Sequence, residues 1–391
     1  MSKIEELIQQ YCPDGVEYVK LGDVVQVCRG TRVVKSQLSD TGYPVYQNCL
    51  APMGYFTESN CSGGTTFVIC AGAAGNIGYS DVDCWAADDC EYIKCDSHIL
   101  NKYIYYCLMT NQHHLLSQVR KASIPRLSPS VIKNLEIPLP PLPVQEEIVR
   151  ILDTFTELQA ELQAELQARQ LQYQYYRDKL LNFNDLNRGG QSEVEWKKLG
   201  EICLKICSGG TPSRGNGDYF TGSIPWLRTQ EVDFKEIYDT EIKITEEAVK
   251  NSSAKVIPEN CVIVAMYGAT AGKAGINKIP LTTNQACCNL QIDPQKALYK
   301  YVYYWVCNEY EAIKALGQGS QNNINAQIVK DYQIPIPSLE EQERIVAILD
   351  KFDTLVNDLC KGIPAEIEAR RQQYEYYRDK LLTFERKTSS N

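Results

Sequence analysis

One long segment of this chain occurs twice. Residues 137–153, a proline-rich entry followed by a helical pattern, recur as residues 334–350, 197 positions later. The seven residues Tyr-Tyr-Arg-Asp-Lys-Leu-Leu at 175–181 recur unchanged at 376–382, after a shift of 201 positions. Repeats of this kind mark a duplicated unit, so the fold has to provide two equivalent places for the repeated helix.

The segments between the helices also match, although more loosely. Residues 17–24 return as residues 195–202, and each copy leads through a Cys-x-Gly motif to a threonine, Thr31 or Thr211. The sequence pattern of each half therefore predicts a mixed α/β globule of about 140 residues followed by a long helix. We predict an α+β fold with an internal pseudo-twofold repeat. Its segments are 1–141 (first globule), 142–189 (central helix), 190–338 (second globule) and 339–391 (C-terminal helix).

The two long helices should pack against each other. About forty residues at 1.5 Å each make a rod of roughly 60 Å, and a helix with one apolar stripe requires a partner helix. We predict an antiparallel coiled coil of the two copies, with the second copy broken at Gly362 and Pro364. A short amphipathic helix is expected over 1–12, with Ile4, Leu7, Ile8 and Tyr11 on one face. The stripe of the first long helix consists of Ile148, Leu152, Phe155, Leu158, Leu162, Leu166, Tyr173, Tyr176 and Leu180.

Charge and composition limit the class of protein. The net charge is −9, and the four segments carry −3, −3, −1 and −2, so none is the basic domain expected of a protein that binds DNA alone. The longest apolar run, 261–266, is too short to cross a bilayer, and the first residues lack the apolar core of a signal peptide, so we expect a cytoplasmic protein. The sixteen cysteines include no Cys-x-x-Cys pair, so reduced, mostly buried thiols and no metal site are expected.

Catalytic motifs are not recognisable. The glycine-rich stretches 72–78 and 268–275 lack the Gly-x-Gly-x-x-Gly pattern, and the second lacks the Gly-Lys-Ser/Thr ending of a P-loop. We interpret both as turns at strand ends. No two carboxylates fall in a motif that would mark them as an acid/base pair, and no Ser/His/Asp order of a catalytic triad appears. We therefore expect no catalytic residues.

The loops of both globules offer hydrogen-bond donors. Arginine suits guanine, asparagine and glutamine suit adenine, and lysine and threonine suit phosphate groups. The candidate DNA-binding residues are Arg29, Thr31, Arg32, Lys35, Arg120, Lys121, Arg126, Arg214, Arg228, Gln230, Lys273, Asn284, Gln285, Asn322 and Asn323.

At the duplicated helices the chain resembles the specificity (S) subunits of type I restriction–modification systems. The resemblance rests on residues 138–145 and 335–342, on the two identical ends at 175–181 and 376–382, and on the tetrapeptide Glu-Leu-Gln-Ala, repeated three times over 157–168. It covers the whole chain in plan: a target-recognition domain and a conserved helix, twice. It is strong in the helices and loose in the globules.

This resemblance implies a non-catalytic subunit whose globules each read one half of a split, asymmetric DNA sequence. The helix pair would set the gap between the halves. It would also dock two methyltransferase subunits that use S-adenosylmethionine, and through them restriction subunits that use ATP and magnesium, while this chain binds no cofactor itself. The residues assigned to the spacer and to docking are Gln145, Leu158, Leu162, Leu166, Tyr176, Gln342, Phe352 and Tyr377.

Gain or loss of one tetrapeptide within 157–168 should then change the length of the recognised spacer. Two other functions stay open on the residues alone. One is a coiled-coil protein scaffold without DNA readout, which the acidic charge favours. The other is an enzyme with an unrecognised active site, such as a nuclease or a methyltransferase, although the chain lacks the Asn/Asp-Pro-Pro-Tyr/Phe motif of adenine methyltransferases.

Overall fold

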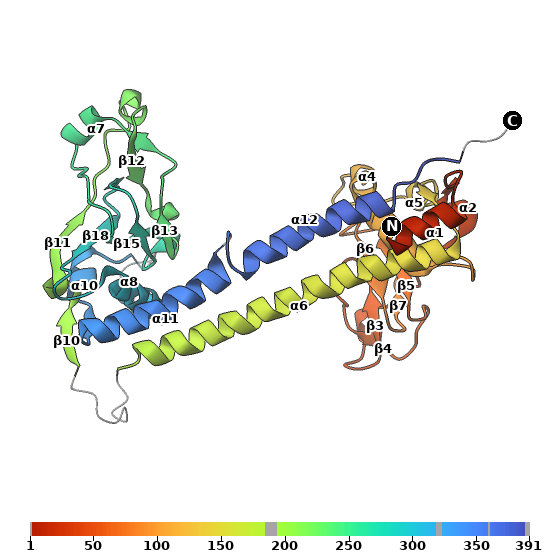
Figure 1. The fold of residues 1–391 in the computed structure, drawn as a ribbon, viewed down its shortest axis with the longest axis horizontal. Coiled ribbons are helices and arrows are strands. Elements are labelled where there is room, and N and C mark those ends of the chain that lie inside the picture. The colour runs from red at the N-terminus through yellow and green to blue at the C-terminus, as the bar shows by residue number, and fades with distance from the viewer. Residues whose placement is uncertain (1, 184–193, 318–322, 359, 388–391) are drawn as a thin grey trace. The chain divides into compact units, whose positions relative to one another are not determined.

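The computed structural model describes residues 2–183, 194–317, 323–358 and 360–387. Two compact units make up the chain. Unit 1 consists of residues 1–164 and 366–391, and unit 2 consists of residues 165–365. Each unit contains one globule and part of the long helices, as the ribbon in Figure 1 shows.

Unit 1 is built on two sheets. The larger one is antiparallel with the strand order β2-β8-β5-β6, and the smaller one has the order β4-β3-β7 with β3 parallel to β7. Helix α3 packs on β5 and β6, and a separate ribbon pairs β1 with β9. The strands are β1 (Tyr18–Lys20), β2 (Gln26–Arg29), β3 (Tyr43–Tyr46), β4 (Tyr55–Phe56), β5 (Thr65–Ile69), β6 (Ile77–Ser80), β7 (Trp85–Ala86), β8 (Cys90–Lys94) and β9 (Glu136–Pro138). The helices are α1 (Lys3–Tyr11), α2 (Leu21–Val24), η1 (Lys35–Gln37), α3 (Asn101–Thr110), α4 (Gln112–Ser117) and α5 (Pro129–Lys133).

Unit 2 repeats this plan with an additional strand. Its larger sheet has the order β11-β18-β15-β16-β13, its smaller sheet has the order β14-β12-β17, and β10 pairs with β19. The strands are β10 (Glu195–Lys198), β11 (Cys203–Ser208), β12 (Ile224–Leu227), β13 (Lys235–Ile237), β14 (Lys243–Ile244), β15 (Val262–Ala265), β16 (Ala274–Asn277), β17 (Thr282–Thr283), β18 (Cys287–Ile292) and β19 (Gln333–Ile336). The helices are η2 (Leu199–Ile202), η3 (Gly217–Phe220), η4 (Thr229–Glu231), α7 (Glu246–Lys250), η5 (Gly268–Thr270), α8 (Tyr299–Asn308), α9 (Tyr310–Ala315) and α10 (Ala326–Asp331).

The two globules are equivalent in their cores as well as in their order of elements. Strands β5 and β15 are buried at every position, as expected of short apolar runs in the middle of a sheet. The buried Tyr103 of α3 donates a hydrogen bond to the Pro138 carbonyl at 2.9 Å, and the buried Tyr301 of α8 donates to the Pro335 carbonyl at 2.7 Å. The tyrosine-rich segments are therefore core helices that fasten the start of each long helix.

The glycine of the repeated Cys-x-Gly motif is explained by close backbone packing. A Cβ atom at Gly30 would lie 2.1 Å from the Ala87 carbonyl oxygen, and one at Gly209 would lie 2.1 Å from the Thr283 carbonyl oxygen. In both units this glycine lets the end of the first sheet strand cross the smaller sheet. The glycine-rich stretches connect antiparallel strands, β5 to β6 and β15 to β16, as expected of turns.

The long helices follow the expected course. Helix α6 (Leu142–Leu181) is continuous over 40 residues, whereas the second copy forms α11 (Leu339–Asn357) and α12 (Ile363–Leu381). The predicted break is confirmed, and Gly362 permits it because a Cβ atom there would lie 2.4 Å from the Thr354 carbonyl oxygen. Pro364 follows as the second residue of α12, where a missing N–H has no cost.

In each unit, one segment of α6 packs antiparallel against a segment of the second copy (Figure 1). In unit 1 the ring of Phe155 lies 5.4 Å from Tyr377 and 6.5 Å from Tyr374. In unit 2 the ring of Phe352 lies 5.4 Å from Tyr176 and 6.1 Å from Tyr173. These two aromatic clusters are the same contact made twice.

One detail of the predicted N-terminal helix is wrong. Ile4 is buried in the core of unit 1, but Tyr11 is 43% exposed. Tyr11 is the last residue of α1, and the chain turns there so that Cys12 enters the core instead.

Candidate nucleic-acid interface and helix surfaces

The candidate residues of unit 1 lie along one edge of its larger sheet. Backbone hydrogen bonds join the chain segments there: Gly30 N to Cys90 O at 2.9 Å, Cys70 N to Asp89 O at 2.7 Å, and Leu127 N to Cys70 O at 2.9 Å. The ends of β2 and β5, the start of β8 and the loop 120–127 therefore meet. Two loops that are ninety residues apart in the sequence form one surface, which we call edge 1.

All seven candidates of unit 1 are exposed on these loops. Arg120 and Arg126 exchange two backbone hydrogen bonds, of 2.9 and 3.2 Å, and so hold the turn that carries Lys121. The Arg29 Nε atom donates to the Asp88 carbonyl at 3.2 Å, which fixes the base of its loop. Thr31, Arg32 and Lys35 follow on the same loop and on η1.

The corresponding edge of unit 2, edge 2, is joined in the same way. Gly210 N donates to Thr283 O at 2.8 Å, and Asn284 N donates to Leu227 O at 2.9 Å. The Thr270 hydroxyl donates to the Thr229 carbonyl at 2.9 Å. The loops after β11, β12, β15 and β17 therefore lie together.

The candidates of unit 2 fall into two groups. Arg214, Gln230 and Gln285 are exposed, and Gln285 is bonded to the Thr211 hydroxyl. The remaining described candidates are half-buried and have internal partners: Arg228 with Glu231 and Glu241, Lys273 with Asp233 at 2.6 Å, Asn284 with the Ala286 N–H, and Asn323 with the Gly268 N–H. Asn322 lies outside the described residues.

The structure adds Asn48 to edge 1. Strand β3 pairs in parallel with β7 as β12 pairs with β17, so the loop after β3 corresponds to the loop that carries Gln230. Asn48 is exposed on this loop, and its carbonyl accepts the Ala73 N–H at 2.9 Å. The sequence match here is short, Thr41-Gly42 and Pro44 against Thr221-Gly222 and Pro225, and the strand pairing identifies the position.

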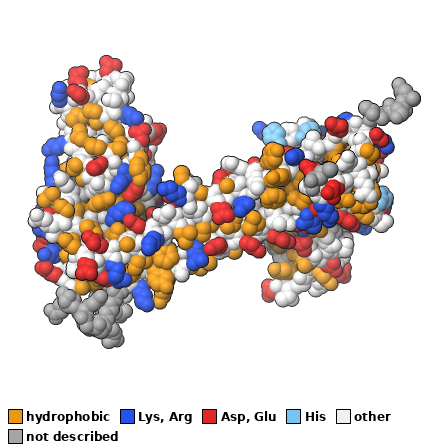
Figure 2. Space-filling model, in the orientation of Figure 1, with side chains coloured by type: hydrophobic (Ala, Val, Ile, Leu, Met, Phe, Trp, Pro, Cys, Tyr) orange, Lys and Arg blue, Asp and Glu red, His pale blue; other side chains and the backbone are white. Residues whose placement is uncertain are grey.

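Charge is mixed on these surfaces. On the face of unit 2 that Figure 2 shows, lysine and arginine side chains lie among aspartate and glutamate side chains. Arg228 and Lys273 are already paired with carboxylates, so the edge offers amide donors more than net positive charge.

The glutamine of each proline-rich motif fastens a long helix to its own globule. Gln145 accepts the Leu100 N–H at 3.0 Å and donates to the Pro140 carbonyl at 2.8 Å. Gln342 accepts the Leu298 N–H at 2.9 Å and donates to the Pro337 carbonyl at 2.9 Å. Both side chains are buried, at 1% and 0% exposure, so they position the helices from inside.

A tyrosine and a lysine make a second fastening in each unit. The Tyr106 hydroxyl donates to Asp153 at 2.5 Å, and the Lys102 ammonium lies 3.0 Å from the other carboxylate oxygen. Tyr304 and Lys300 bind Asp350 in the same way, at 2.6 and 2.7 Å. Burial, and then the carboxylate, raise the pKa of both tyrosines, which therefore stay neutral donors.

The remaining spacer and docking candidates lie on the helices themselves. Leu162 is buried, Leu158, Leu166 and Phe352 are half-buried, and Tyr176 and Tyr377 are each 37% exposed.

The structure points to two further tyrosines. Tyr175 is 59% exposed and stands edge-on to Tyr176, and Tyr376 is 61% exposed and stands edge-on to Tyr377. The identical motif around them was visible in the sequence, but which tyrosine faces outward was not.

Within the described ranges, no group of three or more His, Cys, Asp or Glu side chains is placed to hold a metal ion. All sixteen cysteines are free thiols. The helices of the described residues include none that is long and apolar enough to cross a membrane.

Fold and surfaces together define a duplicated recognition protein, with two equivalent donor-bearing edges on globules that are fastened to paired helices. The family model of the type I restriction modification DNA specificity domain matches residues 13–169 and again residues 191–369. The chain belongs to this family of DNA specificity subunits of type I restriction–modification systems.

Individual relatives agree with this assignment. The specificity subunit of an Escherichia coli type I restriction enzyme is 41% identical over 304 residues, which cover 74% of this chain and 72% of that protein. A putative type I restriction enzyme specificity subunit of Haemophilus influenzae is 31% identical over 390 residues, covering 94% and 96%. In fold, the chain is similar to the crystallised S subunit of a type I system from M. genitalium, with a TM-score of 0.65 at 16% identity over 94% of this chain and 96% of that chain.

Proposed function

We propose that this chain is a non-catalytic subunit that reads a bipartite, asymmetric DNA site, with edge 1 reading one half and edge 2 reading the other. The observation that carries the proposal is the duplication of the edge itself. The loops at equivalent strand ends are polar in both units, but their exposed side chains differ. Edge 1 exposes mainly arginines, whereas edge 2 exposes Gln230 and Gln285. Equivalent surfaces with different donors suit two different half-sites.

The donor types suggest how each half would be read. Arginine can bond to both acceptors of guanine in the major groove, and glutamine can bond bidentately to adenine. On edge 1, Arg120, Lys121 and Arg126 lie on one turn and can serve bases or phosphates. On edge 2, the internally paired Arg228 and Lys273 would shape the loops, while Gln230, Gln285 and Arg214 reach the DNA.

Partner subunits complete the proposed complex. We propose that two methyltransferase subunits dock on the helix surfaces around Tyr175 and Tyr376, because exposed aromatic side chains on rigid supports are typical of interface anchors. The two surfaces have the same residues, which suits two copies of one partner. The methyltransferases would bring S-adenosylmethionine, and restriction subunits docked through them would use ATP and magnesium. The partners would also supply the positive charge that this acidic chain lacks, in the cytoplasm where its DNA target lies.

We propose the same division of labour along the chain as the sequence predicts: recognition by 1–141 and 190–338, and spacing by 142–189 and 339–391. The three tetrapeptides of 157–168 lie inside α6. Adding one lengthens that helix by about 6 Å, so the gap between half-sites should grow. An inserted repeat that leaves the recognised gap unchanged would refute the spacer role.

The test is a selection of bound sequences from random DNA by the complex of this chain with its methyltransferase. Gln230→Ala with Gln285→Ala should relax base preference in one half-site only, by about 1–3 kcal/mol per lost base contact. Arg120→Ala with Arg126→Ala should affect the other half only. The exposed Lys255→Ala serves as the control. Equal loss in both halves contradicts the division between the edges, and no selected motif at all favours the protein-scaffold function.

A further inference from the structure

Unit 1 holds two buried cysteines directly opposite each other. Cys61 and Cys84 are partners in an isolated antiparallel bridge, in which Cys61 N donates to Cys84 O at 3.1 Å and Cys84 N donates to Cys61 O at 2.9 Å. They are 5% and 1% exposed. No other two of the sixteen cysteines, which all lie in the described ranges, are partners in a sheet or bridge. We call Cys61 and Cys84 the bridge thiols.

The geometry of this bridge suits a disulfide. Two residues that exchange both backbone hydrogen bonds across an antiparallel pair have Cα atoms about 5.5 Å apart, with their side chains on the same face. Cysteines joined by a disulfide have Cα atoms about 4.4–6.8 Å apart. The bridge thiols already form a hydrogen bond with each other. A bond between their sulfur atoms therefore requires little movement of the backbone.

The two bridge thiols differ in reactivity. The hydrogen bond from Cys61 lowers the pKa of the Cys84 thiol against the effect of burial, and the same contact raises the pKa of Cys61. The thiolate is the reactive form of cysteine, so Cys84 should react first with an oxidant. Cys61 stands beside it as the thiol that can react with the product.

The bridge thiols lie close to the surface in the sequence and in the fold. Residues 62–63, which follow Cys61, and residues 81–83, which precede Cys84, are all exposed. The Gly63 N–H donates to the Asp83 carboxylate at 2.7 Å, and this bond joins the two exposed segments beside the bridge. Local opening of these segments would admit a small oxidant without unfolding of the core.

The internal repeat contains the same bridge without thiols. Ile257 and Leu281 form an isolated antiparallel bridge in unit 2, and Leu281 directly precedes β17 as Cys84 directly precedes β7. Ile257 and Leu281 are buried as well, at 4% and 0% exposure. Aliphatic side chains therefore fill this position in one unit, so its packing does not by itself require two cysteines.

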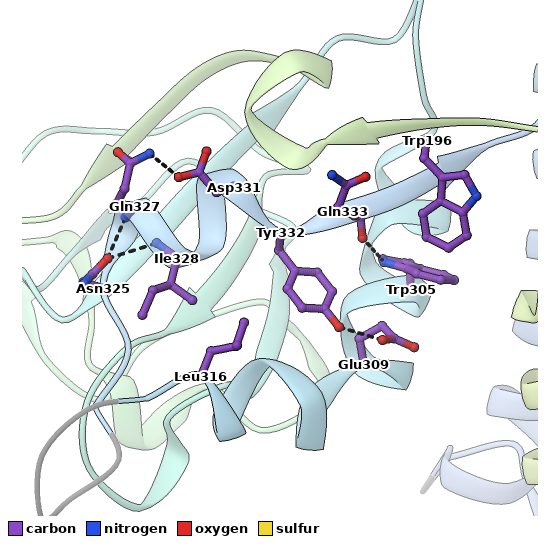
Figure 3. Close-up of a pocket in the computed structure, with 10 residues that line it drawn as sticks. All are labelled: Trp196, Trp305, Glu309, Leu316, Asn325, Gln327, Ile328, Asp331, Tyr332 and Gln333. Carbon is purple, nitrogen blue, oxygen red and sulfur yellow. Dashed lines mark hydrogen bonds between the residues drawn. The ribbon is translucent and has the colours of Figure 1, made fainter.

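The thiols of unit 2 are arranged differently. Figure 3 shows a cavity of about 730 Å³ in this unit, with Trp196 and Trp305 at one end, and none of the ten described residues that line it is a cysteine. The adjacent Cys287 and Cys288 point to opposite faces of β18, because successive side chains of a strand alternate, and they belong to different core clusters. A small oxidant should therefore give a linked pair in unit 1.

A bond at this bridge would fix the support of edge 1. Cys84 leads into β7, where the Ala86 carbonyl accepts the Thr31 N–H at 2.9 Å and Trp85 Nε1 donates to the Thr31 carbonyl at 2.8 Å. The Asn60 side chain bonds to the N–H and the carbonyl of Ala86, at 2.7 and 2.8 Å. The bridge therefore holds the strand on which the first loop of edge 1 begins.

We propose that Cys61 and Cys84 are a redox modification site, at which a peroxide converts the two thiols into a reversible disulfide. The proposal concerns the chemistry and the stability of unit 1 and does not depend on DNA reading. Reversible disulfides of this kind are the form in which protein disulfides usually occur in a reducing compartment.

The reaction balances in two steps. The Cys84 thiolate attacks one oxygen of hydrogen peroxide, the O–O bond breaks, and the products are a sulfenic acid and hydroxide, which takes up a proton to become water. The Cys61 sulfur then attacks the Cys84 sulfur, the S–OH bond breaks, and the hydroxyl group leaves as water with the proton of Cys61. The two thiols lose two electrons, and the peroxide gains them.

The test uses the full chain with the exposed Cys49 and Cys360 replaced by serine, so that these thiols cannot link two molecules. The protein is treated with hydrogen peroxide, unfolded without reductant, alkylated and mapped by mass spectrometry. We expect peptides joined through Cys61 and Cys84, and dithiothreitol should separate them. Because the bond closes a loop of about 20 residues, calorimetry should show a rise of about 5–10 °C in the melting temperature of unit 1.

Matched variants identify the pair. Cys61→Ala and Cys84→Ala should each abolish the link and the rise in melting temperature. Cys90→Ala should leave both in place, because the Cys90 thiol belongs to the same core cluster but donates to the backbone carbonyls of Tyr46 and Gln47.

The contrary results are specific. Free thiols at both positions after the treatment, or a sulfinic acid at Cys84 without a link, would overturn the proposal. A link from either bridge thiol to Cys90, or a linked pair with an unchanged melting temperature, would overturn it as well. If an alanine variant does not fold, the map of the protein with Cys49 and Cys360 replaced decides the question alone.

Discussion

Replacing the buried Gln342 by methionine tests how the long helix is fastened to its globule. The side chain is 0% exposed and bridges the Leu298 N–H and the Pro337 carbonyl, both at 2.9 Å. Methionine has a similar length and volume, so it should leave little cavity, but it can replace neither hydrogen bond. The substitution therefore isolates the polar contribution.

The expected cost follows from the two orphaned groups. A buried backbone donor or acceptor without a partner costs about 1–3 kcal/mol. Because the two groups can relax in part, we expect Gln342→Met to lower the free energy of unfolding of unit 2 by about 2–4 kcal/mol. The midpoint of guanidinium unfolding should fall by about 0.5–1 M for a unit of this size.

Tryptophan fluorescence suits the measurement, because three of the four tryptophans, Trp196, Trp226 and Trp305, belong to unit 2. The matched variant Gln145→Met should destabilise unit 1 and change this signal less. Glu343→Gln, on the exposed face of the same helix turn, is the control. A Gln342→Met midpoint within error of the wild type would refute the reasoning that the motif glutamine is an internal fastening.

Three further predictions concern single side chains. Phe352→Ala removes the ring stacked on Tyr176 and should lower the stability of unit 2 by about 2 kcal/mol, seen by the same fluorescence titration; unchanged stability would contradict the role of the aromatic cluster. The Arg150 guanidinium, opposed by burial and helped by the Lys3 ammonium, lowers the pKa of Glu147 from 4.5 to about 2. Its stabilising effect is thus complete above pH 4.5 and lost as the pH falls toward 2. Glu147→Gln should therefore lower the thermal unfolding temperature at pH 7, and the difference from the wild type should shrink below pH 4.5. A difference that stays constant across this pH range would contradict the ion pair. Gly209→Ala places a Cβ atom 2.1 Å from a carbonyl oxygen and should cost more than about 2 kcal/mol, measured as a lower guanidinium midpoint, whereas a tolerated alanine would refute the close crossing.

Much of the helix architecture could be predicted, because it depends on local and periodic signals. The repeat predicted two equivalent helices, and the apolar stripe predicted that they pack together. The globule between them predicted the antiparallel direction, and Gly362 with Pro364 predicted the break. The role of Gln145 and Gln342 could not be predicted in the same way. A glutamine on a helix is usually exposed, and only the folded structure shows the backbone groups of a distant segment that it binds.

Prediction from the sequence has a similar limit at the candidate DNA edges. The type of loop and its donors were visible in the sequence, but the internal partners were not. Arg228 is paired with Glu241, thirteen residues away, and Lys273 with Asp233, forty residues away. Such pairings depend on the sheet topology, which also brings Asn48 into edge 1.

The most direct test of the central claim is a methylome. Single-molecule sequencing would compare the DNA of cells that express this chain with the methyltransferase of its system and of cells that lack the chain. Our account predicts one new split motif with methyladenine on both strands, which would give both half-sites and the gap. A stable complex with an active methyltransferase that produces no new motif would contradict it and favour a protein scaffold.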